Sequence, residues 1–184
     1  MAHLHEKIDW TVSVFIVHNG KVLLRMHEKY HTLLGVGGHI ELDEDPLTAA
    51  KRECIEEVGL AVHIEGEDEP QPFLEDRLRI LPRPAHLNIH HISVTHQHLG
   101  LVYYATSESA DVTPEHPDDT WGWLSLQEQY TLRLFLFRFA HKTARKVLRS
   151  SKCSLLTKEE IRKRSDIIAN IKYYAIGALD ALGT

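Results

Sequence analysis

Cysteine is scarce in this chain of 184 residues, which contains only Cys54 and Cys153. Two cysteines cannot build a disulfide framework, and these two form no C-x-x-C pair of the kind that holds a structural zinc. Such sparing use of cysteine fits a reducing compartment, so we predict a cytoplasmic location.

Long apolar runs and an excess of basic residues are absent as well. No stretch approaches the roughly 20 apolar residues that span a bilayer, and the N-terminal MAHLHEKIDW lacks the apolar segment of a signal peptide. The net charge of -5 argues against an extended nucleic-acid footprint, which needs a basic patch or stripe. Hydrophobic residues make up 43% of the chain, enough to bury a core. We therefore predict a globular protein whose partner is neither a membrane nor a nucleic acid polymer.

Strand patterns occupy the first part of the chain and residues 85–124. In TVSVFIVHNGKVLLRM, β-branched residues flank Asn19-Gly20, which predicts an antiparallel hairpin. Residues 32–36 form another short apolar piece that leads into Gly37-Gly38. Further strands are expected over residues 60–64 and 121–124, with two more between 85 and 106 that join near Gly100. The polar, proline-rich residues 65–84 predict a long surface loop.

The C-terminal part of the chain is predicted to be helical. Ser125-x-x-Glu128 and Thr157-x-x-Glu160 both fit a capping box. We divide the chain into a domain of residues 1–150 and a C-terminal helical extension of residues 151–184. The last helix has apolar residues near heptad spacing, at Ile161, Ile168, Ile171, Ala175 and Ala178. This stripe either packs on its own domain, which we favour, or forms the seam of a homodimer.

The segment GGHIELDEDPLTAAKRECIEEVGL, residues 37–60, contains the most informative pattern. Asp45 as N-cap, Pro46 in the first turn and Gly59 as a stop predict a helix over Pro46–Val58. At 100° per residue its apolar side chains share one arc of the helix, formed by Leu47, Ala50, Cys54 and Val58. The neighbouring arc consists of Glu53, Glu56 and Glu57, and we call it the acidic arc.

The acidic arc stands where its charges oppose stability. Its glutamates lie in the last turns, where the helix dipole disfavours anions, and like-charge pairs at this spacing cost roughly 0.2–0.5 kcal/mol each. A bound divalent cation would offset both effects, whereas the alternative reading is a solvated acidic surface. Gly37-Gly38 upstream lets the backbone approach a ligand, and oxygen donors favour Mg²⁺ or Mn²⁺ over zinc.

The same segment resembles the Nudix box, the loop-helix-loop signature of the Nudix hydrolases. Gly38 is followed by five residues, Glu44, seven residues, and then RECIEEVGL, so all seven positions of fixed identity match. Cys54 stands where an aliphatic residue is usual. The resemblance implies an α/β fold, the Nudix-type α/β/α sandwich with a mixed sheet, to which the last helix is an extra C-terminal element. It also implies Mg²⁺- or Mn²⁺-dependent hydrolysis of a small-molecule diphosphate, in most cases a nucleotide.

The resemblance also implies roles for the residues at matching positions. Glu53, Glu56 and Glu57 become metal ligands, one of them a candidate catalytic base, and the Gly37 carbonyl becomes a further ligand. Glu44 and Arg52 are expected to orient the helix through an ion pair. An alternative base lies in the loop DVTPEHPDDTWGW, where Glu115 is preferred over Asp118 and Asp119.

Residues outside the box are candidates for contact with the substrate. Arg77 and Arg79 in the long loop could bind phosphate. His96 and His98 would share one face of a strand, where they could contact substrate phosphate. They could instead belong to a transition-metal site, but H-x-H alone lacks the third ligand that such a site needs.

The substrate class stays open between a nucleoside triphosphate and a nucleoside diphosphate sugar. The proline that marks ADP-ribose-type members after the box is absent, and position 75 is Glu. A second function remains, that of a non-catalytic, nucleotide-binding regulatory module with the Nudix fold. Such modules commonly lose box acids, whereas this chain retains every one. Isoprenoid diphosphate isomerisation is disfavoured because it needs a catalytic cysteine, and Cys54 is expected to face the core.

Overall fold

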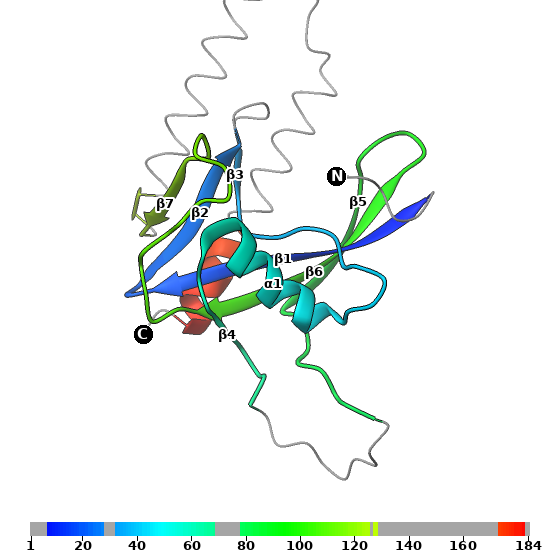
Figure 1. The fold of residues 1–184 in the computed structure, drawn as a ribbon, viewed down its shortest axis with the longest axis horizontal. Coiled ribbons are helices and arrows are strands. Elements are labelled where there is room, and N and C mark those ends of the chain that lie inside the picture. The colour runs from blue at the N-terminus through cyan, green and yellow to red at the C-terminus, as the bar shows by residue number, and fades with distance from the viewer. Residues whose placement is uncertain (1–6, 28–31, 69–77, 126, 129–172, 183–184) are drawn as a thin grey trace, which may run out of the picture.

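The computed structural model describes residues 7–27, 32–68, 78–125, 127–128 and 173–182, which form a layered α/β structure (Figure 1). One mixed sheet has the strand order β3-β2-β1-β6-β4, with β5 paired to β6 and β7 paired to β2. β1 and β6 run parallel, and the other pairs are antiparallel. The strands are β1 (Ile8–His18), β2 (Lys21–His27), β3 (Thr32–Leu34), β4 (His63–Ile64), β5 (His86–His91), β6 (Gln97–Thr106) and β7 (Trp121–Leu124).

The predicted hairpin is formed by β1 and β2. Asn19 and Gly20 both have positive φ, 48° and 70°, as the tight turns that join two antiparallel strands require. The turn sets the register Val17 opposite Val22 and His18 opposite Lys21. Because the period of a strand is two, this register sends alternate side chains of β1 to opposite faces of the sheet.

Two hydrophobic cores lie on the two faces of the sheet. The first packs under helix α1 (Pro46–Val58) and includes Val14 and Ile16 of β1. The second includes Phe15 and Val17 and is covered by the helical residues 173–182, drawn in red behind the sheet in Figure 1. The α/β/α sandwich with a mixed sheet is therefore confirmed, and the described part of the last helix forms its second helical layer.

Close packing explains why residues 173–182 fit this face. Ala175 and Ala178 are fully buried against the sheet. A Cβ on Gly177 would collide with the Tyr104 hydroxyl. Ile161, Ile168 and Ile171, the other members of the predicted stripe, lie outside the described residues, as does the capping box at Thr157. The homodimer alternative thus stays a prediction.

Two strand predictions need correction. The strand expected over residues 60–64 is limited to β4, because Leu60 donates its N–H to Cys54 O at the end of α1 and is buried in the first core. Gly100 does not join β5 and β6 but lies within β6, opposite Asn88. A Cβ there would lie 3.2 Å from the Asn88 side chain, so glycine leaves room for that amide.

Other predicted features agree with the described residues. Ser125 N–H donates to Glu128 Oε2 at 2.8 Å, and Glu128 N–H donates to Ser125 Oγ at 3.3 Å, which is the reciprocal bonding of a capping box. Residues 65–68 and 78–84 of the long loop contain no strand. Arg77 lies outside the described residues.

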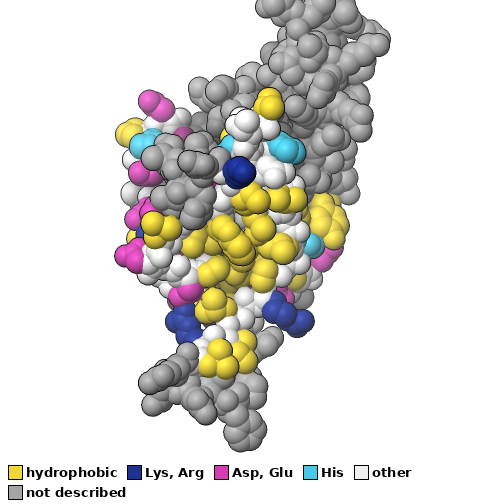
Figure 2. Space-filling model, turned by 90° about the vertical axis from the view of Figure 1, so that its right-hand side faces the viewer, with side chains coloured by type: hydrophobic (Ala, Val, Ile, Leu, Met, Phe, Trp, Pro, Cys, Tyr) yellow, Lys and Arg dark blue, Asp and Glu magenta, His cyan; other side chains and the backbone are white. Residues whose placement is uncertain are grey.

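One side of the molecule is markedly apolar. Figure 2 shows hydrophobic side chains gathered on the side where β5 and β6 lie. Exposed hydrophobic residues here include Trp10 and Ile89, which both pair with Leu99 of β6 and so share one face of the sheet. Among the described residues, no helix is long and apolar enough to cross a membrane.

Candidate active site

Helix α1 presents the acidic arc, and both of its ends were predicted from the sequence. The Asp45 carboxylate accepts hydrogen bonds from Leu47 N–H and Thr48 N–H, at 2.9 and 3.1 Å. Gly59 ends the helix in the left-handed conformation, φ 70°. The apolar arc faces the first core, where Ala50, Cys54 and Val58 are buried and Leu47 is partly buried. This packing fixes the rotation of the helix and therefore the direction of the glutamates.

Arg52 connects the carboxylates of the box. Its Nε and Nη2 donate to the two oxygens of Glu44 at 3.1 and 2.7 Å, so the ion pair expected between these residues is present. Nη1 donates to Glu53 and Glu56 at 2.9 and 2.8 Å. The hydrogen bond from Arg52 lowers the pKa of Glu44. A single guanidinium thus offsets part of the repulsion within the acidic arc and ties the preceding loop to the helix.

Glu57 is held by the backbone of Gly37-Gly38, which we call the glycine segment. Gly37 N–H donates to Glu57 Oε2 at 3.0 Å, while Arg25 Nη1 lies 3.8 Å from the other carboxylate oxygen. Burial raises the pKa of Glu57 to about 6, although the Gly37 hydrogen bond and the Arg25 charge both act to lower it. The carboxylate is therefore a desolvated anion in neutral solution, and the Arg25 guanidinium and the Gly37 N–H stabilise it.

Glu53 lies against Gly38, and no larger residue would fit there. The Glu53 side chain is buried, and burial raises its pKa. A Cβ on Gly38 would collide with the Glu53 carboxylate, and one on Gly37, whose φ is 154°, would collide with Val12 O. Val12 N–H donates to Gly38 O at 2.9 Å, which holds this segment against β1. The two glycines thus allow the backbone to reach the acidic arc.

The loop between β6 and β7, residues 107–120, packs on the C-terminal end of α1, and we call it the acidic loop. Thr113 N–H donates to Val58 O, and Glu115 N–H donates to Glu57 O, at 2.9 and 3.0 Å. The Glu115 side chain is exposed. The fold therefore brings the preferred alternative base to the end of the helix that carries Glu57.

Arg25 and Trp121 are site residues that the sequence reasoning missed. The pairing of β2 with β7 places Arg25 opposite Trp121, and the guanidinium lies 5.4 Å from the centre of the indole ring. Arg25 Nη1 also donates to Asp119 Oδ2 at 2.9 Å. Arg25 thereby joins the acidic loop to Glu57. No local pattern marks this arginine, because the contact depends on two strands far apart in the sequence.

Three of the proposed substrate-contact residues, Arg79, His96 and His98, belong to the described residues and lie outside the acidic arc. Arg79 pairs with Asp45, at the opposite end of α1 from Glu57. His96 Nε2 lies 3.3 Å from Asp9 Oδ2, and the His98 ring contacts the rings of His39, His90 and His96. Contact of these residues with substrate stays a prediction.

The comparisons with known proteins agree with the box geometry. The NUDIX domain model matches residues 7–148. The chain belongs to the Nudix family. A NUDIX-family hydrolase from Clostridium perfringens has a TM-score of 0.63 at 29% identity, over 97% of this chain and 99% of that chain. A MutT Nudix hydrolase from Burkholderia pseudomallei shares the fold, with a TM-score of 0.50 at 21% identity, over 67% of this chain and 87% of that chain.

No curated protein matches this sequence. Family membership and the likeness to the Clostridium perfringens hydrolase nevertheless define the class of this protein: it is an enzyme, a Nudix pyrophosphohydrolase that acts on phosphoric anhydride bonds of nucleoside diphosphate derivatives. The family uses divalent metal ions for this chemistry.

Proposed function

We propose that this Nudix enzyme is a Mg²⁺- or Mn²⁺-dependent hydrolase that cleaves the diphosphate linkage of a nucleoside triphosphate or a nucleoside diphosphate sugar. The observation that carries the proposal is the acidic arc beside the glycine segment, with Glu53 and Glu57 buried or nearly so. Two desolvated carboxylates on one helix face are costly unless a cation offsets their charge.

The donor set suits a hard divalent ion. Glu53, Glu56, Glu57 and the Gly37 carbonyl supply oxygen alone, which is the ligand type that Mg²⁺ and Mn²⁺ prefer. Burial raises the pKa of both Glu53 and Glu57, so each gains from an added positive charge. When bound, such an ion would offset the charge of the diphosphate and acidify a water molecule.

The remaining roles belong to the chain itself. Arg52 and Glu44 orient the acidic arc, since Arg52 bonds the loop before the helix and two glutamates on it. Arg25 and Gly37 N–H hold Glu57 from two sides. Glu115 is the preferred general base outside the box, and the hydrogen bond from Glu115 N–H to Glu57 O supports this choice, because Glu115 then lies near the end of α1 that carries Glu57. Arg77, Arg79, His96 and His98 remain candidates for substrate phosphate.

A substrate screen tests the proposal. Release of phosphate or pyrophosphate would be measured with Mg²⁺ and with Mn²⁺, against nucleoside triphosphates, nucleoside diphosphate sugars, ADP-ribose, dinucleoside polyphosphates and coenzyme A. We expect turnover of a nucleoside triphosphate or a nucleoside diphosphate sugar, abolished by a chelator and restored by added metal. Binding of a nucleotide without turnover under any condition would instead establish the regulatory module.

Location and assembly are further proposals. We place the enzyme in the cytoplasm, because its two cysteines, of which Cys54 is buried and free, suit a reducing compartment. We propose that the last helix packs on its own domain, as residues 173–182 do, with a homodimer as the alternative. Sedimentation of the intact chain and of a chain ending at Ser151 separates the two. An intact dimer that becomes monomeric on truncation would support the seam, whereas an intact monomer at micromolar concentration removes it.

A further inference from the structure

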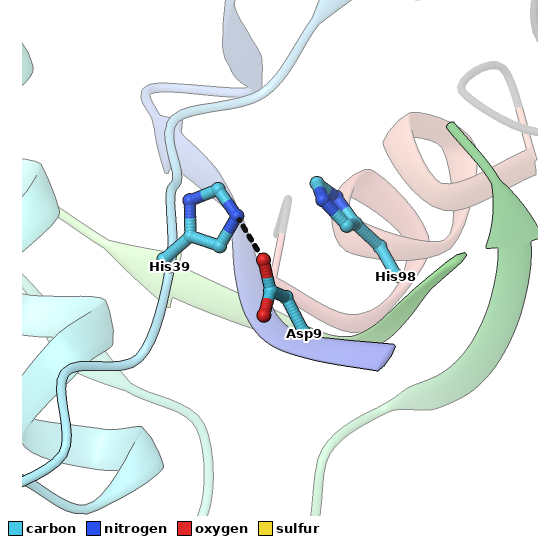
Figure 3. Close-up of side chains that lie close together, drawn as sticks. All are labelled: Asp9, His39 and His98. Atoms are coloured by element: carbon cyan, nitrogen blue, oxygen red, sulfur yellow. Dashed lines mark ion pairs between the residues drawn. The ribbon is translucent and has the colours of Figure 1, made fainter. Parts of the chain in front are cut away.

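A second cluster of ligand-type side chains includes His39, the residue that directly follows the glycine segment. Asp9 of β1, His39 and His98 of β6 each offer one ligand atom, and these atoms lie within 4.8 Å of one another (Figure 3). Asp9 is fully buried, and His39 is 8% exposed. The three come from separate parts of the sequence and converge on one point.

The backbone fixes this convergence. In the parallel pair of β1 and β6, Asp9 is the register partner of His98. His39 is brought to the same end of β1 by its bridge to Thr11 and by the hydrogen bond from Ile40 N–H to Trp10 O, at 2.9 Å. Arg52 Nη2 also donates to His39 O at 3.0 Å, which anchors this residue from the box. The three side chains are therefore positioned by β1, by β6 and by the segment that bridges His39 to Thr11.

The separation of the His39 and Asp9 ligand atoms suits a transition-metal ion. Metal–ligand bonds of about 2.0–2.2 Å place neighbouring ligands of a tetrahedral ion roughly 3.3–3.5 Å apart. His39 Nε2 lies 3.3 Å from Asp9 Oδ2. His96 Nε2 lies at the same 3.3 Å from Asp9 Oδ2, so the carboxylate has a second histidine partner. Two imidazoles and one carboxylate form a donor set that zinc and other first-row transition metals accept, unlike the oxygen-only acidic arc.

We propose that Asp9, His39 and His98 form a transition-metal site of the zinc type, separate from the Mg²⁺ or Mn²⁺ site of the acidic arc. His96 is the outer partner that orients Asp9. An ion bound there would hold residue 39, and with it the glycine segment, against β1.

Zn²⁺ binding to the full chain, prepared without a polyhistidine tag and stripped with chelator, tests the proposal. A competing metal dye would report affinity in excess Mg²⁺, so that the acidic arc does not contribute. We expect one Zn²⁺ per chain, with affinity lowered at least about tenfold in His98→Gln and in His39→Gln, since even outer-shell changes cost about 10–100-fold. Zinc should also raise the unfolding temperature of the wild type but not of His98→Gln.

The matched control is His63→Gln. His63, Glu67 and Asp68 form the other group of metal-capable side chains among the described residues, and the His63 side chain is exposed to solvent. This variant should bind zinc like the wild type, and Glu57→Gln should do the same. Nitrogen-15 NMR of the histidine rings provides a readout in the unmodified protein, with His39 and His98 expected to shift on adding Zn²⁺. Absence of binding, unchanged affinity in His98→Gln, or loss confined to His63→Gln would each overturn the site.

Discussion

The acidic arc and the cluster of Asp9, His39 and His98, which we call the histidine cluster, differ in how the chain assembles them. Glu53, Glu56 and Glu57 lie within one helix, so spacing alone places them together. Asp9, His39 and His98 meet only because β1 pairs with β6 and residue 39 bridges to β1. The arc contains only oxygen donors and stores like-charge repulsion. The cluster contains a carboxylate that two histidines already contact. Removing a charge should therefore have opposite effects on stability in the two regions.

The largest expected effect is on catalysis, in Glu57→Gln. The substitution keeps the size of the side chain but removes an anion that the proposed mechanism uses to hold the metal. We expect kcat/KM to fall by a factor of hundreds or more, which corresponds to roughly 3–4 kcal/mol of transition-state stabilisation. The free energy of unfolding should stay equal or rise by up to about 0.5 kcal/mol, because a repulsive charge is gone.

Steady-state kinetics and denaturant unfolding measure the two quantities. Glu108→Gln, at an exposed position after β6, is the control and should change neither. Near-normal turnover of Glu57→Gln with unchanged metal dependence would favour the alternative interpretation, in which the acidic arc is a solvated surface that binds no metal.

In the histidine cluster, Asp9→Asn should lower stability instead. Asp9 is fully buried, and its Oδ2 lies 3.3 Å from both His39 and His96. Loss of this charged partner should lower the free energy of unfolding by about 1–3 kcal/mol in chelator. Thermal or urea unfolding checks this, with the exposed Asp111→Asn as control. A variant as stable as the wild type would contradict the contrast between the two regions.

Gly38→Ala tests the segment that lies against Glu53 of the acidic arc and directly precedes His39. The added methyl would collide with the Glu53 carboxylate, so either the backbone or the glutamate must move. We expect a loss of about 1–3 kcal/mol in stability, the usual cost of overpacking, together with reduced turnover. Gly122→Ala is the matched control, because a Cβ there meets nothing within 4 Å. Equal behaviour of the two variants would show that Gly38 is not limited by space.

The same contrast explains what the sequence could predict. Both ends of α1 were predicted correctly, since the Asp45 cap, Pro46 and Gly59 act within a few residues of their targets. The H-x-H pattern predicted His96 and His98 on one strand, but β6 begins at Gln97, so only His98 belongs to it. Asp9 and His39 became apparent as neighbours of His98 only through sheet pairing. Arg25 was missed for the same reason, because Trp121 and Asp119 reach it through β7. The join near Gly100 was wrong, since a glycine within a strand is not distinguished from a turn by local pattern alone.

The smallest expected effect concerns the ion pair that supports the acidic arc. The hydrogen bond from Arg52 lowers the pKa of Glu44 below its ordinary value of 4.5. A carboxylate with a lowered folded-state pKa stabilises the protein above its unfolded pKa, and this contribution disappears as the pH falls through the folded pKa. At pH 7, Glu44→Gln should therefore be less stable than the wild type by about 1–2 kcal/mol. The difference should shrink as the pH is lowered below about 4.5.

Urea unfolding at several pH values between about 3.5 and 7 measures the stability difference between Glu44→Gln and the wild type at each pH. The Glu41→Gln variant, at an exposed neighbour of the same loop, should show no such trend. A stability difference for Glu44→Gln that stayed constant with pH would mean that Glu44 acts through packing, and that Arg52 is oriented by Glu53 and Glu56 instead.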